Sequence, residues 1–257
     1  MHYLNTPYDT ISTANAFGLK HPKDVTTLLD AAKVLEEVRS DTPGWDGVLD
    51  PKKVASVVRA NAEHTITTGQ ALTDATNQAR QKIAYALTDA VADNLDGYLD
   101  QIEQRFGDAA EEYAEAVQDL PREFDSSDVT GWEPRMFEAY TRAKQANAVI
   151  EQAKTWLLNL GRVVPSEKLN YNHSSEFLVL SPETLEGYVS IQTANGTTTD
   201  NALRAVNPVR LKAVQDGIVL AVSLPSEVQE MVNGFEEHRQ ALNQQQSRDL
   251  MARAEAY

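Results

Sequence analysis

One stripe of apolar residues runs through the middle of the chain and constrains its fold more than any other feature. The stripe comprises Leu72, Ala75, Ala79, Ile83, Leu87, Val91, Leu95, Leu99, Ile102, Phe106, Ala109, Tyr113, Val117 and Leu120. The mean spacing of about 3.7 residues is that of an α-helix, whereas a strand would show a period of two. Residues 72–120 are therefore predicted to be helical.

The stripe is compatible with two arrangements. One is a single helix of about 50 residues, ~75 Å long at 1.5 Å per residue. The other is an antiparallel pair of helices that breaks at residues 94–97, where the sequence is Asn-Leu-Asp-Gly. Because the register continues across both Gly97 and Gly107, we favour one long helix that could kink at either glycine.

Two shorter helices are expected before the stripe. The first begins near Asp24, which is a favourable N-cap, and its apolar positions continue to Val38. The second follows Asp50-Pro51, where aspartate would cap the helix and proline would take the first helical position.

Two further helices are expected after the stripe. Residues 133–160 carry an apolar seam that repeats about every 3.5 residues, the spacing typical of packed helices. The seam consists of Met136, Tyr140, Ala143, Ala146, Ile150, Ala153, Leu157 and Leu160. A C-terminal helix begins near Ser226, and its apolar face fades into the polar run at residues 243–246.

Residues 165–224 differ from the helical segments in their pattern. Residues 188–193 alternate apolar and polar side chains, as a half-buried strand does, and the adjacent Asn195-Gly196 is a hairpin-turn signal. Residues 209–213 alternate again, and the apolar runs at 176–180 and 218–222 are further candidates. This pattern predicts an α+β insert of three to four strands.

The expected fold class is therefore mainly α: an elongated helical bundle with long helices, a small α+β insert and a C-terminal helix. We divide the chain into four parts. They are a flexible or partner-bound arm (residues 1–20), a helical body (21–160), a small strand-containing region (165–224) and the C-terminal helix (225–257).

Composition argues against several classes of protein. The chain has no cysteine, so it has no disulfide, thiolate metal site or thiol nucleophile. Its 23 Lys and Arg against 38 Asp and Glu give a net charge of −15, which does not suit binding to nucleic acid or an anionic membrane. The sequence shows neither a transmembrane segment nor a signal peptide. We therefore expect a cytoplasmic location or one within an assembled particle.

Known catalytic and metal-binding motifs are missing from the sequence. It contains no nucleophile elbow, phosphate-binding glycine loop or histidine pair at ligand spacing. Residues 92–103 partly fit a calcium loop, but Ala92 stands where the first carboxylate ligand belongs. We predict no cofactor and no metal, and expect a non-enzymatic protein. If the chain is an enzyme, His173 and Glu176 are its one concentrated polar pair.

Acidic residues concentrate on one part of the stripe. Asp89, Asp93, Asp96, Asp100 and Glu103 follow a spacing of three or four residues, and we call them the acidic face. Residues 89–123 contain eleven acidic and two basic side chains, a net charge of −9. Such a face is either solvated or matched to a basic partner.

Two tryptophans stand in turns that precede helices. Trp45 and Trp132 are candidate interface aromatics, since tryptophan is enriched at binding hot spots. The alternative is that each ring covers the start of the helix that follows it.

Three functions follow from these observations. The first is a non-enzymatic structural or interaction protein that forms homo-oligomers and contacts other proteins through long helices, for example in a large phage-like assembly. The second is an acidic module that captures a basic partner through residues 89–123. The third is an enzyme with an unrecognised site.

Overall fold

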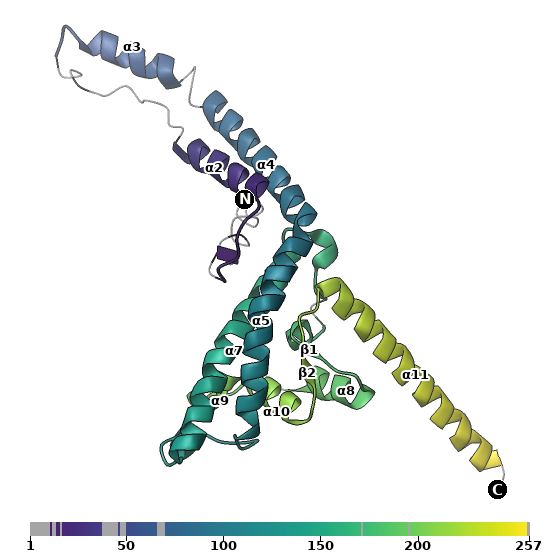
Figure 1. Ribbon diagram of the computed structural model, residues 1–257. Helices are drawn as coiled ribbons and strands as arrows, with labels where there is room; N and C mark the ends of the chain where they lie inside the picture. Colours follow the sequence, from purple (N-terminus) through teal and green to yellow (C-terminus); the bar gives the residue numbers. More distant parts are fainter. Residues whose placement is uncertain are drawn as a thin grey trace. The chain divides into compact units, whose positions relative to one another are not determined.

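The computed structural model of the chain is mainly helical (Figure 1). It describes residues 11, 14–15, 17–37, 46, 50–65, 70–170, 172–194 and 196–255. The chain divides into two compact units. Unit 1 comprises Met1–Tyr8 and His21–Leu95, and unit 2 comprises Asp9–Lys20 and Asp96–Tyr257. The boundary at residues 95 and 96 divides the predicted helical body between the two units.

Unit 1 contains the helices α2 (Lys23–Glu37), α3 (Val54–His64) and α4 (Gln70–Asp93). Helix α2 packs against α4, and Val25 and Leu87 are fully buried. Helix α3 begins three residues after the predicted proline position, because the Asp50 carbonyl and carboxylate first hold residues 51–53 in a turn.

The apolar stripe forms two helices, so the single long helix that we favoured is not observed. Helix α4 ends at Asp93 and α5 (Leu95–Gln118) begins at Leu95. The Asn94 side chain between them donates hydrogen bonds to the Ala90 carbonyl and to the Asp24 carboxylate. Asparagine competes in this way with regular backbone bonding. The boundary falls within residues 94–97, while Gly97 and Gly107 both lie inside α5.

The core of unit 2 is an antiparallel pair formed by α5 and α7 (Pro134–Leu160). The Tyr98 and Trp156 rings meet at a centroid distance of 5.9 Å, and Asp119 near the other end of α5 pairs with Arg135. A short helix, α6 (Ser126–Val129), joins the two and starts with a capping box on Asp125. The predicted seam on α7 is confirmed as its packing face. Its buried members are Ala143, Ala146, Ile150, Ala153, Leu157 and Leu160.

The described part of the predicted N-terminal arm is packed into unit 2. Ile11, Ala14, Phe17 and Leu19 are all buried. The Arg105 guanidinium of α5 lies 5.5 Å from the centre of the Phe17 ring. The backbone of Lys20 also bonds to the Gln101 side chain, so this segment is anchored along α5.

The region predicted to hold three to four strands is mostly helical. After the 3₁₀ turns η2 (Pro165–Glu167) and η3 (Ser175–Leu178), it contains α8 (Leu185–Thr193), α9 (Asn201–Val206) and α10 (Pro208–Gln215). One sheet is found in the described residues: β1 (Leu180–Ser181) pairs antiparallel with β2 (Val219–Leu220).

The strands predicted at 188–193 and 209–213 are wrong because each segment carries helix-start signals outside the alternating window. Thr184 caps α8 by accepting a hydrogen bond from the Gly187 amide, and Tyr188 and Ile191 are buried at helical spacing. Asn207, with a φ of 60°, caps α10 and Pro208 occupies its first turn. A five- or six-residue alternation is too short to outweigh such caps.

In the C-terminal helix α11 (Pro225–Glu255), the buried residues among those whose side chains are described lie in the first turns. Val228 and Val232 are buried, and the Phe235 ring stacks on Tyr188 at 5.0 Å. Every residue from Glu237 to Arg248 is exposed. None of the described helices, α11 included, combines the length and the apolar character needed to cross a membrane.

Candidate functional site

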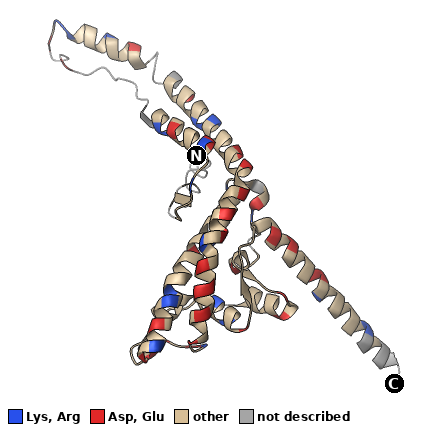
Figure 2. Cartoon of the chain, viewed as in Figure 1, with Lys and Arg blue, Asp and Glu red and all other residues tan. Residues whose placement is uncertain are grey.

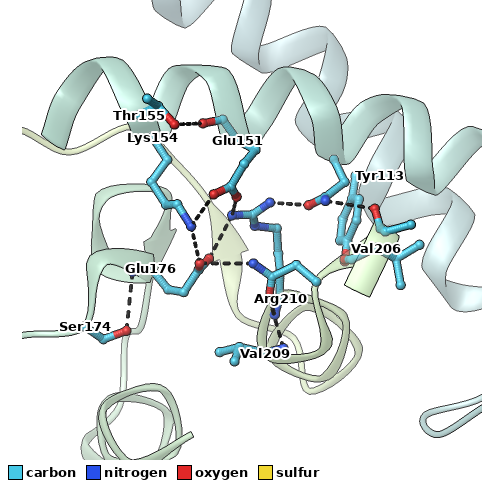
Figure 3. Close-up of polar contacts among 12 residues, drawn as sticks. Tyr113, Glu151, Lys154, Thr155, Ser174, Glu176, Val206, Val209 and Arg210 are labelled. Carbon is cyan, nitrogen blue, oxygen red and sulfur yellow. Dashed lines mark hydrogen bonds and ion pairs between the residues drawn. The ribbon is translucent and has the colours of Figure 1, made fainter. Parts of the chain in front are cut away.

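Four charged side chains of unit 2 form a largely buried ion network, in which Glu151 is partly exposed (Figure 3). We define the network as Glu151 and Lys154 from α7, Glu176 from η3 and Arg210 from α10. Arg210 is fully buried, and Lys154 and Glu176 are each 7% exposed. The network therefore joins three elements that are distant in sequence.

Each cation of the network contacts both carboxylates. The Lys154 ammonium lies 2.6 Å from Glu176 Oε1 and 2.7 Å from Glu151 Oε1. The Arg210 guanidinium lies 2.8 Å from Glu176 Oε2 and 3.1 Å from Glu151 Oε2. Two positive charges thus face two negative ones, which is the condition for keeping charged groups in a protein interior.

Asparagine side chains complete the network. Asn207 donates from Nδ2 to Glu176 Oε1 at 3.0 Å, while its Oδ1 caps α10. Arg210 donates from Nη1 to Asn147 Oδ1, and Asn147 in turn donates to the Ala205 carbonyl at 2.9 Å. Among the described residues, the Arg210 Nε has no hydrogen-bond partner.

The electrostatics of the network hold Glu176 in its ionised form. Burial by itself raises the pKa of this carboxyl, but the charges of Arg210 and Lys154 and the hydrogen bonds from Lys154 and Asn207 outweigh it, so the pKa is lowered. Beside the network, burial raises the pKa of Tyr113, whose hydroxyl donates to the Val206 carbonyl at 2.6 Å. Both groups therefore keep one protonation state near neutral pH, and the arrangement suits stability better than proton transfer.

The predicted pair of His173 and Glu176 is not brought together. Glu176 faces the ion network, whereas His173 lines an open pocket of about 480 Å³ between the end of α7 and residues 168–170. Burial lowers the pKa of His173, and the nearby charge of Glu236 opposes this shift. The pocket lining does not include Glu176.

The acidic face is divided between the two units. Asp89 and Asp93 belong to α4 in unit 1, while Asp96, Asp100 and Glu103 belong to α5 in unit 2. All five side chains are exposed, and none forms an ion pair with a residue that the structure describes. Figure 2 marks the acidic positions along the α5 ribbon in red.

Acidic residues nearer the end of α5 are compensated by α7. Arg142 contacts Glu112 and lies 3.1 Å from Glu115, and Arg135 lies 3.0 Å from Asp119. The contact with Arg142 lowers the pKa of Glu112. Among the described residues, Asp96, Asp100 and Glu103 near the start of α5 are therefore unpaired, whereas Glu112 and Glu115 near its end pair with α7.

Of the two candidate interface aromatics, the structure describes Trp132. Its ring is half-buried between Phe124, at 5.0 Å, and Tyr140, at 5.8 Å, where the chain enters α7. This position fits a ring that covers the start of a helix. Trp45 lies outside the described residues.

Of the four residues in the ion network, the sequence analysis singled out Glu176 alone. Arg210 stands in the alternating run Val-Arg-Leu-Lys-Ala. If this run is interpreted as a strand, Arg210 falls on the solvated face of that strand. Glu151 and Lys154 are three apart beside the α7 seam, which is the spacing of an ordinary surface pair. The one signal in the sequence that could have revealed the position of Arg210 was the Asn207-Pro208 cap. This cap predicts a helix, and in a helix Arg210 need not face the solvent.

Comparisons with known proteins do not suggest a function for this chain. In the described part of the chain, no three His, Asp or Glu side chains gather closely enough to hold a metal ion. No family model, curated protein or solved structure matches this chain.

Proposed function

We propose that this chain is a non-enzymatic interaction protein that self-associates through its helices, with the exposed part of α11 as a principal contact. The observation that carries this proposal is that all residues from Glu237 to Arg248 are exposed along a continuous helix. Helices in proteins gain most of their stability from packing of an apolar face, so a partner packed against this segment would stabilise it.

The face that α11 would offer continues the one that already packs. Val228 and Val232 are buried, Phe235 contacts Tyr188, and Leu242 lies two turns beyond Phe235 on the same side. The Leu242 side chain is 39% exposed, which is high for a large apolar residue. A second copy of α11 packed along this face would bury it.

The charged groups of unit 2 favour an interaction protein over an enzyme. The buried carboxylate Glu176 is neutralised by Lys154 and Arg210, and each of its oxygens accepts at least one hydrogen bond. A general acid or base needs a proton that can move to or from a substrate. An elongated shape and a role in a large, phage-like assembly would fit this function. The chain would then act in the cytoplasm or within the assembled particle.

The proposal is tested by sedimentation equilibrium of two single variants. Leu242→Glu places a charge on the proposed contact face and should weaken self-association by about tenfold or more, since burying an unpaired carboxylate costs over 1.4 kcal/mol. Gln244→Glu makes the same change of charge on the opposite side of the helix and should leave association unchanged. Equal association of the wild type and both variants would contradict the role of α11.

The acidic module is the second candidate, and three unpaired carboxylates near the start of α5 favour it. Asp96, Asp100 and Glu103 are exposed and uncompensated by described residues, unlike Glu112 and Glu115 on the same helix. A basic partner would be attracted to these charges, with an affinity that falls as salt rises.

This candidate predicts a specific loss of binding. Asp93, Asp96 and Asp100, changed together to Asn, should weaken binding of a lysine-rich peptide at least tenfold in a calorimetric titration at low salt. The control variant changes Glu138, Glu183 and Glu230 to Gln, three exposed acidic residues elsewhere in unit 2. The two variants have the same net charge, so equal affinities for the peptide would show that only total charge matters.

A further inference from the structure

The open pocket beside His173 differs in charge from the rest of this acidic chain. Its lining includes Arg162 and Lys168 together with His173, and no described Asp or Glu contributes to it. Neither Arg162 nor Lys168 forms an ion pair with a residue that the structure describes. In a chain with a net charge of −15, two uncompensated cations at one cavity form a local positive site.

The acidic residues near the pocket are engaged elsewhere. Glu167 is buried and accepts hydrogen bonds from the backbone and hydroxyl of Ser226. Glu176 belongs to the ion network, and Glu236 accepts from the Tyr188 hydroxyl and pairs with Arg239. None of these three carboxylates forms an ion pair with Arg162 or Lys168.

Hydrogen bonds and one close backbone contact hold the segments that carry the pocket lining. Gln192 of α8 accepts from the Ser174 amide and donates to the Asn172 carbonyl at 2.8 Å. At the end of α7, a Cβ on Gly161 would lie 2.5 Å from Lys168 Cα, so only glycine allows this close approach. These contacts support the backbone around the pocket, on which Arg162 and Lys168 are placed.

Apolar side chains complete the lining. Leu158 is 39% exposed although it is a large apolar residue on the last turns of α7, and Leu169 lies on the facing segment. A ligand with only a charged group would leave these side chains in water. A ligand with a charged group and an apolar body would bury them as well.

We propose that this pocket binds a small organic anion, a phosphate ester or carboxylate with an apolar body. Arg162 and Lys168 hold the anionic group by charge-assisted hydrogen bonds, and Leu158 and Leu169 contact the apolar part. The cavity of about 480 Å³ is within the range of about 300–1,000 Å³ typical of small-molecule sites. This inference is independent of the proposed self-association.

The test titrates the full chain with phenyl phosphate, benzoate, inorganic phosphate and benzyl alcohol, using ¹⁵N-edited NMR. We expect saturable binding of phenyl phosphate or benzoate, with amide shifts centred on Gly161, Asn170 and His173. Inorganic phosphate should bind more weakly because it lacks the apolar body, and benzyl alcohol should bind more weakly because it lacks the charge. Phenyl phosphate and benzoate distinguish a phosphate site from a carboxylate site.

A matched pair of variants separates the pocket from general electrostatics. Arg162→Ala with Lys168→Ala should weaken binding at least about tenfold, because two charge-assisted hydrogen bonds are lost. Lys144→Ala with Lys212→Ala removes the same charge from exposed sites outside the pocket and should leave the affinity unchanged. Absence of saturable binding to the wild type, or an equal loss in both variants, would overturn the proposal.

Discussion

Replacing Glu176 by Gln should lower the free energy of unfolding of unit 2 by about 3–5 kcal/mol, the cost of breaking a buried ion pair from one side. Glutamine keeps the shape of the side chain but removes its charge and turns an amide donor toward the network. Lys154 and Arg210 would then share only Glu151, which is 44% exposed at its side chain. Chemical denaturation followed by circular dichroism and tryptophan fluorescence measures the change.

Asp119→Asn is the matched control for this substitution. It removes the carboxylate of an exposed pair with Arg135 and should cost less than about 1 kcal/mol. Adding Arg210→Met to Glu176→Gln should recover part of the loss, since it removes the cation left without a counter-charge. A loss below about 1 kcal/mol in the single Glu176 variant would contradict the stabilising role of the network.

The same substitution changes how stability depends on pH. The pKa of Glu176 is lower in the folded chain than in the unfolded chain, so its contribution is complete above the unfolded value. The contribution is lost as the pH falls through the folded value. The wild type should therefore lose stability more steeply than Glu176→Gln as the solution is made acidic below about pH 4.5.

Replacing Phe17 by Ala should lower the stability of unit 2 by about 3–5 kcal/mol, the usual cost of removing a buried aromatic ring. Phe17 is 2% exposed and lies under the Arg105 guanidinium. The substitution therefore removes both core packing and a cation–π contact. Denaturation under the conditions used for the Glu176 variants measures this loss.

Lys20→Ala provides the control within the same segment. Its side chain is exposed, while its backbone makes the bonds to Gln101, so the change should stay within about 0.5 kcal/mol. If Phe17→Ala were equally mild, the packing of the described residues of this segment along α5 would be contradicted, and the flexible arm predicted as one alternative for residues 1–20 would be favoured.

Long-period apolar patterns were the most reliable guide to the fold. The α7 seam, from Ala143 to Leu160, is buried as predicted because many members of one repeat agree on a single face. The break at Asn94 was harder to place, because one side chain bonding to Ala90 and Asp24 decides it. The spacing of apolar residues in the sequence does not reveal such a tertiary contact.

Short patterns and buried charges account for what the sequence missed. The alternation at 209–213 suggested a strand, but the Asn207 cap and Pro208 start a helix whose buried face includes Arg210. Its partners Glu151 and Glu176 are 59 and 34 positions away in sequence, and only the fold brings the three together. The sequence alone does not distinguish a buried arginine from an exposed one, because it does not show which residues pair with it.

Sedimentation velocity of the wild-type chain at micromolar concentrations tests the central claim, self-association through exposed helices, most directly. The runs are made at about 50 mM and 500 mM salt, because apolar helix contacts resist screening while surface ion pairs do not. We predict an oligomer whose size is the same at both salt concentrations. A compact monomer at both salt concentrations would contradict the claim. Binding of a basic partner by the exposed acidic residues of α5 would then be the better-supported function.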